Sequence, residues 1–133
     1  MTETTEAELG DGIRWGRVIV GGLIIELVLA VITGLFYGLD RVEDLARWVI
    51  PATIVAGLLG GAWTGRGVSR PVLHGALAGV AAIVLYVILA VVGLMAAPDQ
   101  VTTEALVTPV NLATHAVKVI AGAAGAWLVA RRT

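Results

Sequence analysis

The run VIVGGLIIELVLAVITGLFYGL at residues 18–39 contains one charged residue, Glu26, in an otherwise apolar stretch. As a helix that rises about 1.5 Å per residue, this run is ~33 Å long, which is enough to cross the ~30 Å hydrocarbon core of a bilayer. Three further runs meet the same length criterion, namely residues 48–65, 71–97 and 109–130. The sequence therefore predicts one domain over residues 1–133, an all-α integral membrane bundle of four helices.

The composition agrees with this prediction and excludes several other classes of protein. Hydrophobic residues make up 58% of the chain and charged residues 14%, against about 45–50% and about 25% in soluble domains. There are two histidines and no cysteine, so we expect no metal centre and no cofactor. Nine basic residues against ten acidic ones provide no nucleic-acid-binding surface. No motif sets a nucleophile beside a base or cradles a phosphate, so we do not expect an enzyme.

The arginines predict the orientation in the membrane. Six of them flank the same ends of the predicted spans: Arg14, Arg17, Arg66, Arg70, Arg131 and Arg132. The other ends carry two arginines, Arg41 and Arg47, among five acidic residues. By the positive-inside rule both termini lie in the cytoplasm, which fits the plasma membrane of a prokaryote. Residues 1–13 are then a flexible acidic cytoplasmic tail, and the lipid bilayer is the main partner of the chain.

Local signals predict where the helices begin. Polar residues that can accept hydrogen bonds from a first helical turn are Asp40 with Glu43, Ser69 before Pro71, and Thr108 before Pro109. The connection 98–107 is long enough for a short interfacial turn. The sequence RVIVGGL at 17–23 is similar to RPVLHGAL at 70–77. This similarity has two interpretations, a repeat of two parallel helical hairpins or a chance likeness between glycine-rich membrane helices.

Small residues predict how the helices pack. Glycine accounts for 17 of the 133 residues, well above the usual ~7%. Small residues four positions apart let membrane helices approach closely. This spacing occurs at Gly34/Gly38, Gly57/Gly61/Gly65, Gly75/Gly79 and Ala121/Gly125. We expect these faces to close one bundle, with homodimerisation through a leftover face as the alternative.

Four polar residues at membrane depth form the candidate site: Glu26, Lys118, His115 and Asn111. Glu26 lies about 13 Å and Lys118 about 20 Å from the arginine-rich side, a difference that a lysine side chain can bridge. We expect an ion pair between Glu26 and Lys118, provided that the first and fourth spans are neighbours. Asn111 and His115 share a helical stripe with Lys118 and are expected to hydrogen-bond beside the pair.

Two further residues are secondary candidates. Tyr37 continues the stripe of the first span that contains Glu26. His74 lies about 6 Å beyond Arg70, close enough to the interface for a structural or interfacial role.

The candidate site has two functional interpretations. In the first, the chain is a non-catalytic subunit or assembly protein, bound to itself or to another membrane protein, and the neutral Glu26–Lys118 pair fixes the helix register. In the second, the chain is a small proton-coupled transporter in which Glu26 is the protonatable site, because intramembrane acids and bases commonly mark transport paths.

Two stretches resemble known proteins. The stretch GGAWTGRGVSRPVLHGALAG at Gly60–Gly79 resembles the middle of small prokaryotic four-span proteins of unknown role, a resemblance that implies a fold and no activity. The segment GGLIIE at Gly21–Glu26 resembles the first helix of the small multidrug resistance exporters, which are four-span chains with an essential acid in that helix. This second resemblance implies that Glu26 binds a proton or a cationic drug in turn. The third span departs from that family, because it lacks the pattern Gly-x-Ala-Tyr-Ala-x-Trp.

Overall fold

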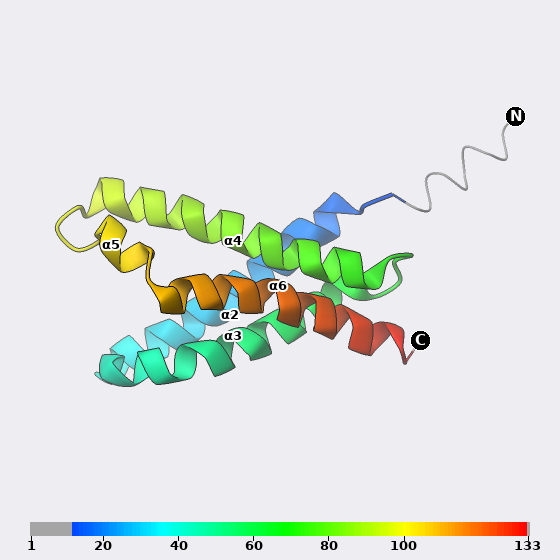
Figure 1. Cartoon of the computed structure of the whole chain (residues 1–133), viewed down its shortest axis with the longest axis horizontal. Coiled ribbons are helices and arrows are strands. Elements are labelled where there is room, and N and C mark those ends of the chain that lie inside the picture. The colour runs from blue at the N-terminus through cyan, green and yellow to red at the C-terminus, as the bar shows by residue number, and fades with distance from the viewer. Residues whose placement is uncertain (1–11, 133) are drawn as a thin grey trace, which may run out of the picture.

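The computed structural model describes residues 12–132, and within them it contains helices and no strand. The four long helices are α2 (Trp15–Gly38), α3 (Val42–Gly65), α4 (Pro71–Ala96) and α6 (Pro109–Ala130), with a short α5 (Thr103–Leu106) in the last connection (Figure 1). Each long helix is long and apolar enough to cross a membrane, so the chain is an all-α, four-span membrane protein. Nearly all of the predicted acidic tail lies outside the described residues.

Two helices extend beyond the predicted spans. The first begins at Trp15 instead of residue 18, and α3 begins at Val42 instead of residue 48. The length criterion counts only the apolar run, whereas a helix continues into the polar interface. In α3 the first turn contains Glu43 and Asp44, whose negative charges favour a helix N-terminus. The predicted interfacial turn at 98–107 contains α5.

One of the three predicted caps is present. The Thr108 hydroxyl accepts a hydrogen bond from the backbone N–H of Asn111 at 3.2 Å, which caps α6. The other two predictions are wrong, because Arg41 and Arg70 occupy the capping positions of α3 and α4 and neither helix has a side-chain cap. Asp40 instead adopts a left-handed backbone conformation with φ 54° in the tight turn after α2.

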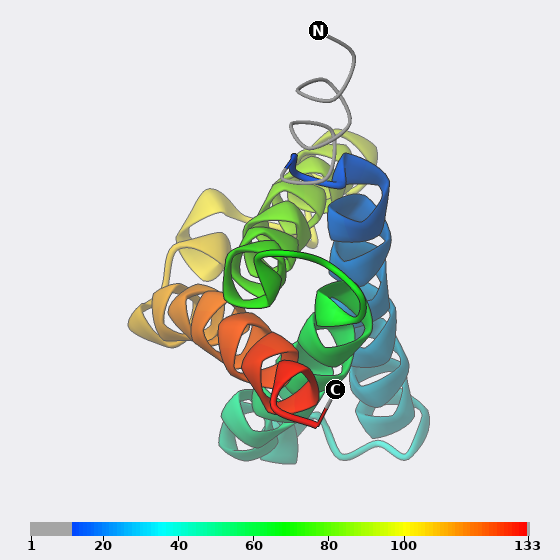
Figure 2. The ribbon, with the colours of Figure 1, turned by 90° about the vertical axis from the view of Figure 1, so that its right-hand side faces the viewer.

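The helices pack around a central contact between α3 and α4. Both α2 and α6 pack against α3 and α4, whereas α2 and α6 lie on opposite sides of the bundle and do not pack along each other (Figure 2). The condition placed on the predicted ion pair, that the first and fourth spans are neighbours, is therefore not met. The contact between α3 and α4 keeps α2 and α6 apart. In a repeat of two equivalent hairpins, α2–α3 and α4–α6, a contact between α2 and α6 would match the one between α3 and α4. That contact is not made, so the two hairpins differ in their packing.

The bundle has two distinct ends. The arginine end contains the starts of α2 and α4 and the ends of α3 and α6, with the residues Arg14, Arg17, Arg66, Arg70, Arg131 and Arg132. The loop end contains the α2–α3 turn and α5 (Figure 1). Among the described residues of the long helices, those that are buried lie between the middle and the arginine end, except Thr114 and Lys118 of α6.

Glycine packing closes the arginine-end half. A Cβ atom added to Gly61 would lie 2.0 Å from the carbonyl oxygen of Gly122, and one added to Gly75 would lie 2.2 Å from the same oxygen. The backbones of α3, α4 and α6 are therefore in direct contact, as the predicted small-residue faces require. The prediction is wrong for Gly34 and Gly38, where an added Cβ would meet nothing within 4 Å.

Candidate functional site

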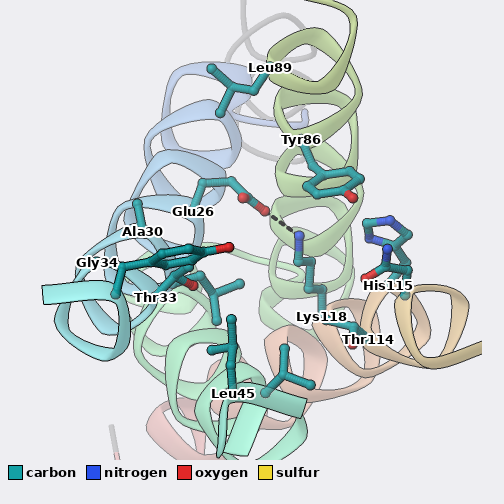
Figure 3. A pocket seen from close by; sticks show the side chains of 14 residues that line it. Glu26, Ala30, Thr33, Gly34, Leu45, Tyr86, Leu89, Thr114, His115 and Lys118 are labelled. Atoms are coloured by element: carbon teal, nitrogen blue, oxygen red, sulfur yellow. Dashed lines mark hydrogen bonds and ion pairs between the residues drawn. The ribbon is translucent and has the colours of Figure 1, made fainter. Parts of the chain in front are cut away.

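The predicted ion pair is present at the centre of the bundle. The Lys118 ammonium group on α6 donates a hydrogen bond to the Glu26 carboxylate on α2 (Figure 3). The pair forms although α2 and α6 are not adjacent, because the long lysine side chain crosses the space between them. The Lys118 side chain is 2% exposed and that of Glu26 is 14% exposed. Lys118 is thus almost completely enclosed, and Glu26 is the more exposed of the two partners.

An aromatic residue that the sequence analysis did not single out lies beside the pair. The ring of Tyr86 on α4 has its centroid 5.0 Å from the Lys118 ammonium nitrogen, within the range of a cation–π contact. The same ring meets the His115 ring edge-on, with centroids 4.7 Å apart. Tyr86 and His74 are the two polar residues of the span 71–97, a signal that could have identified Tyr86.

The two other predicted members of the cluster do not hydrogen-bond to the pair. The side-chain amide of Asn111 donates to the carbonyl oxygens of Ala105 and Leu106, at 3.0 and 3.1 Å, and so holds α5 against α6. His115 contacts Tyr86, and its Nδ1 atom is buried without a hydrogen-bond partner among the described residues. The prediction that Asn111 and His115 hydrogen-bond beside the ion pair is therefore wrong. The spacing of residues along α6 gives no information on the position of the α5 carbonyl groups that Asn111 contacts.

The pair forms the deep end of a cavity. A space of about 590 Å³ begins at Glu26 and Lys118 and is lined by all four long helices (Figure 3). On α2 the lining extends from Glu26 to Tyr37, and on α6 from Lys118 to Asn111, in both cases toward the loop end. Tyr37 is 63% exposed at the outer part of this lining. The cavity therefore approaches the pair from the loop end, while the glycine contacts fill the opposite side.

His74 has a separate position at the arginine end. It is 1% exposed, and it lies about 18 Å along α4 from Tyr86. Its Nε2 atom accepts the backbone N–H of Arg14 at 3.1 Å, and its Nδ1 atom contacts the carbonyl oxygen of Arg70 at 2.8 Å. Because an N–H group can only donate, Nε2 is unprotonated and Nδ1 carries the proton. His74 thus joins the starts of α2 and α4 and does not belong to the pair.

In the part of the chain that the structure describes, no three His, Asp or Glu side chains lie together in a group that could hold a metal ion. Comparison of the sequence with protein-family models and with curated proteins, and of the fold with solved structures, finds no significant match. The two sequence resemblances therefore stay predictions. The four long apolar helices identify the chain as a four-span membrane protein.

Proposed function

We propose that this protein is a small transporter that exchanges an organic cation for a proton, with Glu26 as the carboxylate that binds the cation. The observation that supports this proposal is the cavity that ends on the Glu26–Lys118 pair. A pair that only fixes helix register needs no such space. Glu26 is the more exposed partner of the pair, so it is the group that a solute in the cavity contacts more readily.

The walls of the cavity suit a cation with an apolar body. Leu29, Leu45 and Leu89 provide apolar surface, and the rings of Tyr86 and Tyr37 lie on the same lining. An aromatic face attracts a desolvated cation by up to about 2 kcal/mol. Such a ligand would therefore gain contacts with both the walls and the carboxylate, which a hydrated inorganic ion would not.

Lys118 provides a physical reason for coupling to protons. A cation that binds the Glu26 carboxylate displaces the Lys118 ammonium group, which then lacks a counterion in a nearly sealed position. A buried, unpaired charge costs several kcal/mol. Lys118 therefore releases its proton to water in the cavity and becomes a neutral amine, so that one positive charge enters and one leaves. When the cation departs, the amine takes up a proton and the pair forms again.

We further propose a location and an orientation. The bias of arginines toward one end favours the plasma membrane of a prokaryote, with both termini in the cytoplasm. The cavity then opens away from the cytoplasm, and transport requires the glycine contacts of the arginine end to separate. The role of the chain is non-catalytic in this proposal.

The test is uptake of tetraphenylphosphonium by vesicles that contain the purified full-length chain and carry an imposed pH gradient. We expect uptake with the wild type and none with Glu26→Gln. Lys118→Arg preserves a positive partner for Glu26 but cannot release a proton, so it should also abolish uptake. Protein-free vesicles give the passive background, and circular dichroism checks that each variant is folded. Wild-type uptake no higher than background, or unchanged uptake in Glu26→Gln, would contradict the proposal.

A second candidate is a subunit or assembly protein that binds itself or another membrane protein. It is favoured by the completeness of the pair within one chain, which leaves neither charge dependent on a ligand. Here removal of one charge should lower the free energy of unfolding by about 3–5 kcal/mol, and removal of both should restore most of it. Glu26→Gln, Lys118→Met and the double variant provide this cycle. Absence of uptake, together with a stoichiometric companion or a stable homo-oligomer purified from native membrane, would favour this candidate.

A further inference from the structure

The starts of α2 and α4 lie side by side at the arginine end. His74 bridges the backbone N–H of Arg14 and the backbone carbonyl of Arg70, which fixes the two arginines at the same level. Neither helix has an acidic residue in its first turn or a side-chain cap. Both helix N-termini, which carry partial positive charge, therefore add to the two guanidinium groups. Among the described residues, this corner of the bundle is therefore positively charged.

The two guanidinium groups are available for a ligand. Arg14 and Arg70 are exposed, and within residues 12–132 neither side chain has a hydrogen bond or an ion pair. Arg17 provides a contrast, because its guanidinium group donates to the carbonyl oxygens of Arg66 and Trp63 and lies 5.1 Å from the centroid of the Trp63 ring. Among residues 12–132, the closure of the arginine end thus uses the Arg17 side chain and not those of Arg14 and Arg70.

An apolar groove begins directly below this corner. It has a volume of about 380 Å³, lies between α2 and α4, and extends from Trp15 past Ile19 and Val80 to Val84. Trp15 is 58% exposed and Val84 is 53% exposed, so the groove faces outward and not toward the ion pair. It shares no lining residue with the cavity at Glu26. A groove on the outer surface of a membrane-spanning helix pair is in contact with lipid chains.

We propose that this corner and groove form a binding site for one anionic phospholipid. The phosphate lies between the guanidinium groups of Arg14 and Arg70, one acyl chain lies in the α2–α4 groove, and the Trp15 indole lies at the level of the ester groups. A soluble anion would match the arginines but would leave the groove unused, whereas a zwitterionic lipid would fill the groove without matching the net positive charge. The role of His74 is then to set the spacing of the two arginines. This site does not depend on the proposed transport function.

The test is native mass spectrometry of the full-length chain after equilibration with equal amounts of phosphatidylglycerol and phosphatidylcholine. The wild type should retain phosphatidylglycerol in preference to phosphatidylcholine. In Arg14→Gln/Arg70→Gln the preference should fall, by about fivefold for each arginine removed. His74 contacts backbone groups of both residues, so these substitutions leave its bridge in place.

A matched variant separates a site from general attraction to a basic surface. Arg131→Gln/Arg132→Gln removes the same charge from the same end of the bundle and should keep the preference within about twofold of the wild type, since exposed charges far from the site act only through a screened field. The proposal fails if the wild type shows no preference for phosphatidylglycerol. It also fails if the two double variants lose the preference equally.

The groove is tested independently of the charges. Val84→Trp fills the groove with a large side chain and should lower the number of retained phosphatidylglycerol molecules by one. The control is Ile120→Trp on α6, where the native side chain is 69% exposed and lies outside the groove. Retention that is unchanged in Val84→Trp, or reduced equally in Ile120→Trp, would show that no acyl chain occupies the groove.

Discussion

The two halves of the bundle are built from the same four helices but are held together differently. At the arginine end, glycines of α3, α4 and α6 place backbone against backbone, as at Gly61 and Gly122. At the loop end, larger side chains such as Leu45, Tyr86 and Leu89 face one another, and a cavity remains between the helices. In a bilayer, the burial of apolar surface contributes little to the free energy of helix association, so close van der Waals contact must stabilise the packed helices. The size of the facing residues therefore determines which half is closed.

The ion pair lies at the boundary between these halves, which explains why its two partners differ in exposure. Lys118 is the largest of the fully buried side chains among the described residues, and on the closed side a Cβ added to Gly79 would lie 2.6 Å from the Lys118 carbonyl oxygen. Both side chains line the cavity of the open side, and Glu26 is the more exposed of the two. An ammonium group and a carboxylate can thus share one hydrogen bond and still have different access to solutes.

The largest expected effect comes from an added methyl group in the closed half. In Gly61→Ala the new Cβ would lie 2.0 Å from the backbone oxygen of Gly122, so α3 and α6 must separate. Overpacking of this kind should lower the free energy of unfolding by about 3 kcal/mol. Denaturation of the purified protein in mixed detergent micelles, followed by circular dichroism, measures the change.

The matched control makes the same substitution in the open half. An alanine Cβ at Gly34 meets nothing within 4 Å, so Gly34→Ala should change the free energy of unfolding by less than about 1 kcal/mol, with alanine the better helix former. Equal losses at Gly61 and Gly34 would contradict the division of the bundle into a packed and an open half.

The next largest effect is a difference in chemical accessibility. The chain contains no cysteine, so single cysteines report on single positions. Thr33 lines the cavity, whereas Thr64 is 0% exposed and donates to the carbonyl oxygen of Gly60 at 2.7 Å. In detergent, a water-soluble maleimide should label Thr33→Cys at least about ten times faster than Thr64→Cys, because thiol reactivity requires access. Similar rates at both positions would mean that the arginine-end half opens as readily as the cavity.

These differences between the halves mark the limit of what the sequence could predict. Length and hydropathy predicted the four spans, and two opposite charges at similar depth predicted the pair, because both depend on position along a single helix axis. Which helices touch depends on how whole faces fit together, and the spacing of glycines does not decide it. Gly34 and Gly38 have the same spacing as Gly57 and Gly61, but only the second pair faces a neighbouring backbone.

The hydrogen-bond partners of polar side chains show the same limit of prediction from sequence. Thr108 was predicted as a cap because it precedes Pro109, and the N–H group that it accepts belongs to Asn111, three residues away in sequence. Asn111 and His115 were assigned to the pair because they share a stripe with Lys118, but Asn111 bonds to α5 instead, whose position follows from the path of the connection. The cap at Thr108 could thus be predicted from local sequence, although those at Asp40 and Ser69 could not, and the partner that α5 supplies to Asn111 depends on the path of the connection.

The smallest expected effect concerns how the open half is held. In the absence of glycine contacts, the amide of Asn111 attaches α5 to α6 through two carbonyl oxygens, and Thr102 caps α5 by accepting the N–H of Ala105 at 3.2 Å. Asn111→Ala should destabilise α5 locally by about 1–2 kcal/mol, and Thr102→Ala by about 1 kcal/mol. Amide hydrogen exchange over residues 103–107 measures both.

Neither variant should change amide exchange in the arginine-end half, because none of the described residues there shares a hydrogen bond with α5. In the Asn111→Ala background, Thr33→Cys should also be labelled faster if α5 restricts access to the cavity, since Asn111 lines that cavity as well as holding α5. If Asn111→Ala speeds amide exchange in α5 but does not speed the labelling of Thr33→Cys, the entrance to the cavity lies away from α5, between α2 and the other helices. Slower exchange at residues 103–107 in Asn111→Ala would contradict the role of the amide in holding the open half.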